Sequence, residues 1–226
     1  MHNKKQKKEF TEIHQIVAKL PRNYLSLYAL YSTGEQAFLD YQKLLIQATE
    51  TSDTDERTQL IIKRYQCRDI AVVFSHLFME AVIYDYGAIN TSDTYMKKYV
   101  DKLDFLAKWV VIPKLITGCS FPTNSQAFQL LSKLKKARNE LVHFKTRKRE
   151  DNKSSEGVEN IFRDEMEISE CFDCMSESLS ELCKLDDQKW PLFKWAFIER
   201  LISKTYNDVR ESAAKDIRRL LGINLQ

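Results

Sequence analysis

The sequence predicts an all-α fold, a multi-helix bundle of roughly seven to nine helices. Glycine and proline are scarce, with 5 and 4 residues in a chain of 226, about one third of their usual combined share. Apolar residues recur at helical spacing along most of the chain, and no long segment alternates with a period of two. A chain of this length can bury roughly 70% of its extended surface, so a sizeable core is expected.

Residues 1–50 are expected to form N-terminal helices. An apolar stripe over residues 9–20 ends at Pro21, and proline suits the first turn of the helix that follows. That second helix should reach about Thr49, with a break near residues 32–34.

Residues 51–150 are expected to form the helical core. The polar residues 51–55 should cap a long helix that runs to about Gly87. Its middle, AVVFSHLFMEAVI (71–83), is apolar on nearly all sides, which is typical of a central helix buried on most of its surface.

Two further helices complete this central part. The first, over about residues 95–110, should be broken by Pro113. After an irregular connection, Asn124 or Ser125 can cap the second helix, which should reach about Lys148.

Residues 151–226 should form C-terminal helices that pack on the core. The polar stretch 149–157 has the composition of a loop. Apolar residues then repeat at helical spacing over 161–182, and two further helices are expected after Leu185.

Charge is distributed unevenly, although the whole chain carries only +3. Residues 133–149 hold eight basic residues and one acidic residue, a net charge of +7, whereas residues 150–187 hold thirteen acidic and three basic residues, a net charge of −10. The basic segment can attract a polyanion such as RNA. The acidic segment could shield it in the same chain or contact another subunit.

Neither a signal peptide nor a membrane span is predicted. The basic residues 1–8 precede no apolar segment, and the longest apolar run is too short to cross a bilayer. The five cysteines are few and odd in number, and we interpret them as reduced core thiols. Cys171, Cys174 and Cys183 offer only three of the four ligands of a structural zinc site. We expect a cytoplasmic protein with no metal, no cofactor and no membrane association.

Candidate functional residues are those that break the apolar pattern of a helix. Within the helix expected over 124–148, Arg138 falls inside the apolar stripe, whereas Asn139 and His143 face outward together. Because a guanidinium keeps its charge in proteins, an anion must lie within reach of Arg138.

Acidic groups on the central helix offer one explanation for Arg138. Asp69, His76 and Glu80 share a narrow stripe of that helix, and an Arg138–Glu80 ion pair would satisfy both groups. In that interpretation the site is structural, His143 is a surface histidine and His76 is a core histidine.

A phosphate-handling cluster is the other explanation. The planar guanidinium of Arg138 can hold a phosphate, and the imidazole of His143 can transfer protons near neutral pH. Basic residues that could attract the polyanion lie on both sides in the sequence: Lys133, Lys136, Lys145, Arg147, Lys148 and Arg149.

The string ARNELVHFK, residues 137–145, resembles the Arg-Asn-x-x-x-His signature of the HEPN superfamily (higher eukaryotes and prokaryotes nucleotide-binding), a group of α-helical proteins. The context agrees, because the motif ends a predicted helix and follows an apolar helix like the one around Glu80. The stretch Trp109 to Gly118 is also similar to such proteins. The resemblance covers about residues 55–150.

This resemblance implies a HEPN-like helical core that forms a homodimer, with two motifs facing each other across a cleft. Many members are metal-independent endoribonucleases that act as toxins, with an antitoxin partner, or in abortive infection (phage defence). By the resemblance, His143 would transfer protons for attack by the ribose 2′-hydroxyl, Arg138 would stabilise the scissile phosphate and Asn139 would orient it. Glu80 would have a supporting role, and it is matched by its helix rather than by a motif.

Other members of the superfamily lack activity, and this leaves a second hypothesis open. A catalytically inactive RNA-binding or protein-interaction module would account for the basic segment equally well, because charge runs are usually solvated helix faces.

Overall fold

The computed structural model describes residues 24–142 and 166–186. About 85% of these residues are helical, and no strand occurs among them, which confirms the predicted all-α fold. The helices expected over residues 9–20 and after Leu185, and the loop at 149–157, lie outside the described residues. The elements in chain order are α2 (Tyr24–Glu50), α3 (Thr54–Asn90), α4 (Asp93–Tyr95), the π-helical turn η1 (Met96–Val100), α5 (Phe105–Thr117), α6 (Gln126–Val142) and α8 (Ile168–Leu185).

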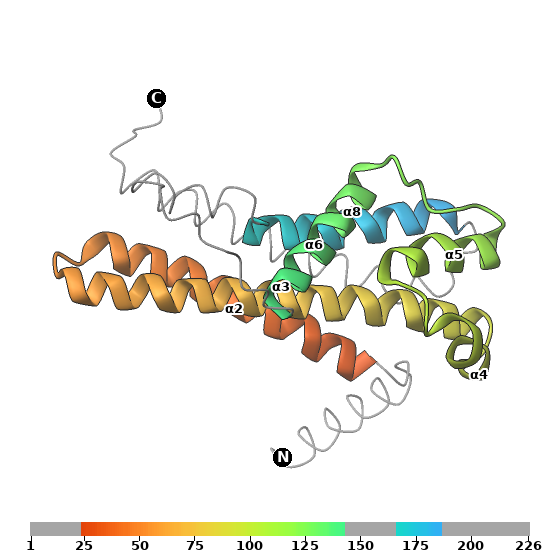
Figure 1. Cartoon of the computed structure of the whole chain (residues 1–226), viewed down its shortest axis with the longest axis horizontal. Coiled ribbons are helices and arrows are strands. Elements are labelled where there is room, and N and C mark those ends of the chain that lie inside the picture. The colour runs from red at the N-terminus through yellow and green to blue at the C-terminus, as the bar shows by residue number, and fades with distance from the viewer. Residues whose placement is uncertain (1–23, 143–165, 187–226) are drawn as a thin grey trace, which may run out of the picture.

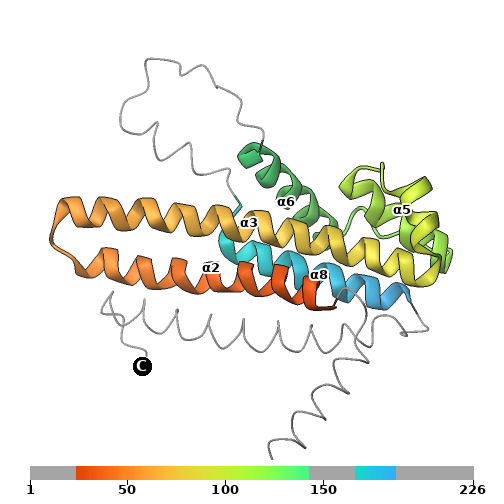
Figure 2. The same ribbon diagram turned by 90° about the horizontal axis from the view of Figure 1, so that it is seen from below.

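Helices α2 and α3 form a long antiparallel hairpin that runs along the long axis of the molecule (Figures 1 and 2). The predicted polar cap of α3 is confirmed, because the Asp53 carboxylate accepts hydrogen bonds from the backbone N–H groups of Asp55 (2.8 Å) and Glu56 (3.0 Å). With 37 residues, α3 is about 55 Å long, and every other described helix lies against it or beside it.

The break predicted near residues 32–34 is wrong, because α2 is continuous through them. The hydroxyls of Ser32 and Thr33 donate to the carbonyl of Ala29, a local bond that serine and threonine make without ending a helix. Gly34 is buried, and a Cβ built there would lie 3.9 Å from the carbonyl oxygen of Ala71. This glycine therefore lies where α2 and α3 approach closely.

One hydrophobic core joins residues from α2, α3, α5, α6 and α8. Its centre is the middle of α3, as predicted for residues 71–83. In Figure 2, α8 runs along the α2–α3 pair, while α6 lies on α3 at an angle. The largest side chains with less than 2% exposure include Phe78 and Tyr86 of α3, Trp109 of α5, Leu134 of α6 and Phe121 of the connection between α5 and α6.

The helix break predicted at Pro113 is wrong. Pro113 is buried inside α5, where it removes a single hydrogen bond that packing of the neighbouring Trp109 and Ile112, both 0% exposed, outweighs. The chain breaks earlier, at residues 101–104, where the Asp104 carboxylate accepts from the Leu106 N–H at 3.0 Å and caps α5. Gly118, with φ of +80°, ends this helix.

Helices α6 and α8 start at polar caps. The hydroxyl of Ser125 accepts from the Phe128 N–H at 3.2 Å, which confirms the predicted cap of α6. In α8, Glu167 and Glu170 form a reciprocal capping box.

By length and hydropathy, α3 would be long and apolar enough to cross a membrane. However, 61% of its most apolar window is buried inside the protein, as expected for the central helix of a bundle.

Candidate functional site

The Arg-Asn-x-x-x-His string falls at the end of α6. Arg138 and Asn139 lie in its last described turns, and His143 follows Val142, the last described residue of this helix. His143, Lys145, Arg147, Lys148 and Arg149 lie outside the described residues. The structure therefore describes the arginine and asparagine of the predicted catalytic set.

Arg138 is half-buried and contacts the side chain next to it. Its Nη1 donates a hydrogen bond to Asn139 Oδ1 at 3.1 Å. Among the described residues, no carboxylate lies within ion-pair distance of Arg138. The guanidinium charge is therefore not neutralised within this part of the chain.

The predicted Arg138–Glu80 ion pair is wrong. Glu80 Oε1 instead accepts a hydrogen bond from Lys108 Nζ at 2.9 Å. The Lys108 side chain is only 5% exposed and the Glu80 side chain is 37% exposed. The reason is the position of α5, which places a buried ammonium against this part of α3, and a buried ammonium requires an anionic partner.

Lys108, the partner of the predicted site residue Glu80, was missed in the sequence interpretation. It stands in FLAKWVVIPKLIT, residues 105–117, where apolar residues flank it on both sides. A lysine between apolar residues on both sides indicates either an exposed stripe or a buried ion pair. The second alternative could have been considered from the sequence alone.

His76 is a buried residue of α3 near Glu80. It is 4% exposed, and its ring packs against Phe105 with 4.3 Å between centroids. Its Nδ1 is buried and has no hydrogen-bond partner. Burial lowers the pKa of His76 to about 4, and the positive charges of Arg138 and Lys135 act in the same direction, against the carboxylates of Glu80 and Asp104. The imidazole is therefore neutral at pH 7.

The structure thus brings together two of the three polar residues predicted on one stripe of α3. His76 and Glu80 both lie at the junction with α5 and α6. Asp69 is about 10 Å further along the helix axis, and its carboxylate accepts from its neighbour Arg68 at 2.9 Å. Asp69 is therefore not part of the candidate site.

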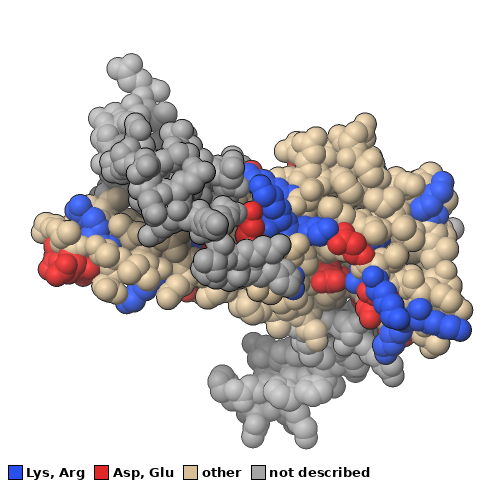
Figure 3. Space-filling view, viewed as in Figure 1, with Lys and Arg blue, Asp and Glu red and all other residues tan. Residues whose placement is uncertain are grey.

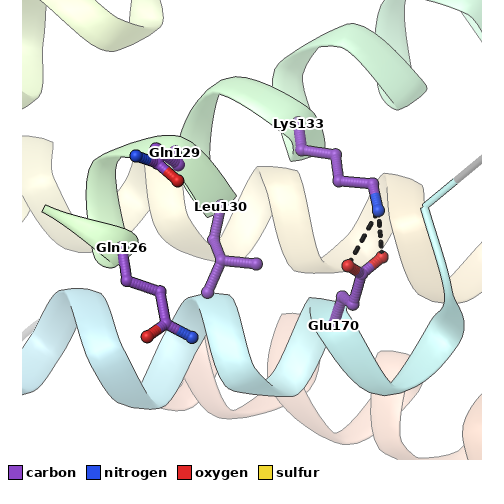
Figure 4. Close-up of a pocket in the computed structure, with 5 residues that line it drawn as sticks. All are labelled: Gln126, Gln129, Leu130, Lys133 and Glu170. Carbon is purple, nitrogen blue, oxygen red and sulfur yellow. Dashed lines mark hydrogen bonds and ion pairs between the residues drawn. The ribbon is translucent and has the colours of Figure 1, made fainter. Parts of the chain in front are cut away.

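The described lysines of α6 differ in their availability to a ligand. Lys133 forms a bidentate ion pair with Glu170 of α8, at 2.6 and 2.7 Å (Figure 4). Lys135 pairs with Asp104 at 2.7 Å. Lys136 is exposed and forms no ion pair among the described residues. Of the two described lysines predicted to bind RNA, Lys136 is therefore available and Lys133 is neutralised.

An open hollow of about 460 Å³ lies between α6 and α8 (Figure 4). Its lining consists of two amides, one leucine and the ion pair just described: Gln126, Gln129, Leu130, Lys133 and Glu170. Most of this lining belongs to the first half of α6, whereas Arg138 belongs to its end. The hollow is therefore separate from the arginine motif.

Residues 24–142 and 166–186 contain no assembled metal-binding or reactive-thiol site. No group of histidine, cysteine, aspartate or glutamate side chains there could hold a metal ion. Cys171 and Cys174 are buried in α8, and burial raises the pKa of the Cys171 thiol to about 12. Cys119, in contrast, is exposed, unlike the core thiol that we expected.

Comparison with known proteins identifies no relative. No protein-family model, curated protein or solved structure matches the chain. The function must therefore be argued from the residues and their arrangement.

Proposed function

We propose that the chain is a metal-independent endoribonuclease of the HEPN type, with Arg138, Asn139 and His143 as its catalytic residues. The observation that carries this proposal is the state of Arg138. Its guanidinium is half-buried and hydrogen-bonded to Asn139, yet no described carboxylate neutralises it. A structural arginine in this position would be expected to have an acidic partner, whereas an arginine that binds phosphate needs an uncompensated charge.

The bond between Arg138 and Asn139 also supports the proposal. It orients the guanidinium from one side and leaves its other N–H groups available for the oxygens of a phosphate. The Asn139 amide oxygen accepts this bond, so its NH₂ group remains free to donate to the same phosphate. Preorganised donors of this kind stabilise charge that develops in a transition state.

In the proposed reaction, His143 accepts the proton of the ribose 2′-hydroxyl as that oxygen attacks the adjacent phosphorus. The bond from phosphorus to the 5′-oxygen breaks, the leaving oxygen takes a proton from water, and the His143 imidazolium returns its proton to the solvent. The products end in a 2′,3′-cyclic phosphate and a 5′-hydroxyl. Arg138 would stabilise the negative charge on the phosphate oxygens in this step, and no metal is required.

Glu80 takes a supporting rather than a direct part in this proposal. Its carboxylate holds the buried ammonium of Lys108 and is one of two carboxylates that act on His76. The pair links α5 to α3, and both of these helices contact α6. We therefore place Glu80 among the residues that position the site.

A homodimer, with two motifs across one cleft, and an antitoxin partner remain part of the proposal. The role of a toxin or of an abortive-infection protein in phage defence follows from the same resemblance. In a dimer of that kind, the second copy would supply a second Arg138 and His143 to the same RNA.

Cleavage of RNA in the presence of EDTA tests the proposal. Purified full-length protein should cleave a single-stranded RNA, and the variants Arg138→Ala and His143→Ala should be inactive. Lys63→Ala, which removes an exposed basic residue of α3, is the matched control and should retain activity. RNA binding by the parent without any cleavage would contradict the nuclease proposal and favour the inactive RNA-binding module.

A further inference from the structure

Two tyrosine rings are presented to solvent just beyond the end of α3. Tyr95 is 37% exposed and Tyr99 is 57% exposed. Their ring centroids are 5.0 Å apart and the ring planes are inclined by 50°. Large aromatic residues of the core, such as Trp109 and Phe78, are in contrast fully buried.

The backbone that carries these rings is firmly anchored. Met96 and Val100, on the inner side of η1, are 0% and 3% exposed. Met96 packs so closely on α3 that a Cβ built at Gly87 would lie 2.6 Å from its Cε. The Asp101 N–H donates to the Met96 carbonyl at 2.9 Å, the wide bond of a π-helical turn.

Positive charge lies beside the rings. The ammonium of Lys98 lies 5.0 Å from the centroid of the Tyr99 ring. Lys97 is paired with Asp93 at 2.9 Å, but Lys98 and Lys102 are exposed and form no ion pair among the described residues. In Figure 3, basic side chains gather at this end of the molecule, with acidic side chains beside them.

We propose that Tyr95 and Tyr99 form a stacking platform for unpaired RNA bases, with Lys98 and Lys102 contacting the phosphates. Exposed aromatic rings next to lysines are the combination by which proteins hold single strands without reading their sequence. The anchored backbone favours this use, because a segment that is already ordered loses little conformational freedom when a base stacks on its rings.

The platform rests on the proposed function, since it supplies a second contact for the same RNA. Along α3, Gly87, which lies against Met96 of η1, is 11 residues from His76, whose pKa the charge of Arg138 lowers, and this separation corresponds to about 16 Å. At about 3.4 Å per nucleotide of one strand, this is roughly five nucleotides. A 12-nucleotide RNA is therefore long enough for the test.

Fluorescence anisotropy with a fluorescein-labelled 12-nucleotide oligouridine tests the platform. The full-length protein should carry His143→Ala in every sample, so that the RNA is not cleaved. In this background, Tyr95→Ala or Tyr99→Ala should weaken binding about 5- to 100-fold. Phenylalanine at either position should restore binding, because it keeps the ring. Tyr65→Ala is the matched control, since Tyr65 is also 37% exposed but lies on α3 away from η1.

The lysines have a separate readout. Replacing Lys98 and Lys102 with glutamine should reduce the salt dependence of oligouridine binding, because fewer RNA phosphates are then neutralised by the protein. The slope of log affinity against log salt should become shallower by about 0.7 for each lysine that binds a phosphate. Duplex RNA should compete poorly with the oligouridine, because its bases are already stacked.

Failure of the platform and failure of the nuclease proposal are distinguishable. If the alanine variants bind oligouridine as tightly as their parent, the platform is wrong even where the wild-type protein cleaves RNA. If binding depends on Tyr95 and Tyr99 but the wild-type protein never cleaves RNA, the platform stands and the nuclease proposal falls. If the parent does not bind oligouridine at all, the platform is overturned and the exposed pair is better explained as a protein contact.

Discussion

Lys108 of α5 donates a hydrogen bond to Glu80 of α3 at 2.9 Å, and this contact joins two helices that both contact α6. The two partners are buried to very different degrees, with 5% exposure for Lys108 and 37% for Glu80. Water can therefore solvate the carboxylate but barely reaches the ammonium. The two halves of the pair should consequently respond differently to mutation.

Glu80→Leu should lower the free energy of unfolding by about 1–3 kcal/mol, because it leaves the Lys108 ammonium buried without a partner. Lys108→Met should cost less than about 1 kcal/mol, since the abandoned Glu80 carboxylate can still be hydrated. Urea titration of both variants provides the measurement. The double variant should be more stable than Glu80→Leu alone, and a larger cost for Lys108→Met than for Glu80→Leu would contradict this account.

Stability should fall as the pH decreases from about 6.5 to about 4. Burial lowers the pKa of His76 from 6.5 to about 4, so the unfolded chain binds a proton in this range that the folded protein does not. The contribution of neutral His76 is fully present above pH 6.5 and amounts to at most about 3 kcal/mol.

Urea titrations at pH 7.5 and pH 5 test this dependence. His76→Phe, which keeps a ring against Phe105, should lose less stability between the two values than the wild-type protein. Equal losses would show that His76 does not titrate as proposed.

The two described glycines inside helices should respond in opposite directions to alanine. At Gly34 a new Cβ would meet its nearest neighbour at 3.7 Å, an ordinary contact, so alanine should raise the free energy of unfolding by about 0.5–1 kcal/mol. At Gly87 the Cβ would lie 2.6 and 2.7 Å from Met96 Cε and Sδ and 3.1 Å from Ile112 Cγ2. There alanine should cost about 1–3 kcal/mol.

Thermal or urea unfolding of both glycine variants measures these changes. Met96→Ala should be less destabilising in the Gly87→Ala background than in the wild-type protein, because it removes the clash. A Gly87→Ala variant that is as stable as the wild-type protein, or more stable, would refute the packing described for η1.

Arg138→Gln should change the free energy of unfolding by less than about 1 kcal/mol. No described carboxylate depends on this arginine, and glutamine can still donate a hydrogen bond toward Asn139. Equilibrium unfolding in urea measures the change. A loss of more than about 2 kcal/mol would identify Arg138 as a structural residue and weaken its assignment to phosphate binding.

Much of the fold could be predicted from the sequence, because helix signals are local. The scarcity of glycine and proline and the apolar periodicity predicted an all-α protein, and Asp53 and Ser125 lie at the predicted caps. The errors at residues 32–34 and at Pro113 have a common cause. Glycine and proline disfavour a helix locally by about 1–3 kcal/mol. Packing of the surrounding helix into the core outweighs this cost in α2 and in α5.

The candidate site could be predicted only in part, because its contacts depend on tertiary packing. Sequence spacing correctly placed His76 and Glu80 on one face of α3. It could not show that Lys108, rather than Arg138, pairs with Glu80, since that choice depends on how α5 and α6 lie on α3. The exposed pair Tyr95 and Tyr99 was likewise missed, because the side of η1 that stays exposed depends on how Met96 and Val100 pack into the core.

The most direct test of the central claim is the rate of EDTA-resistant RNA cleavage by the single variants Arg138→Ala and His143→Ala and by the double variant. If the two residues act in one transition state, each single variant should lose nearly as much activity as the double variant, and the wild-type products should carry 2′,3′-cyclic phosphate ends. Cleavage that survives both substitutions, or that requires a divalent metal, would contradict the account.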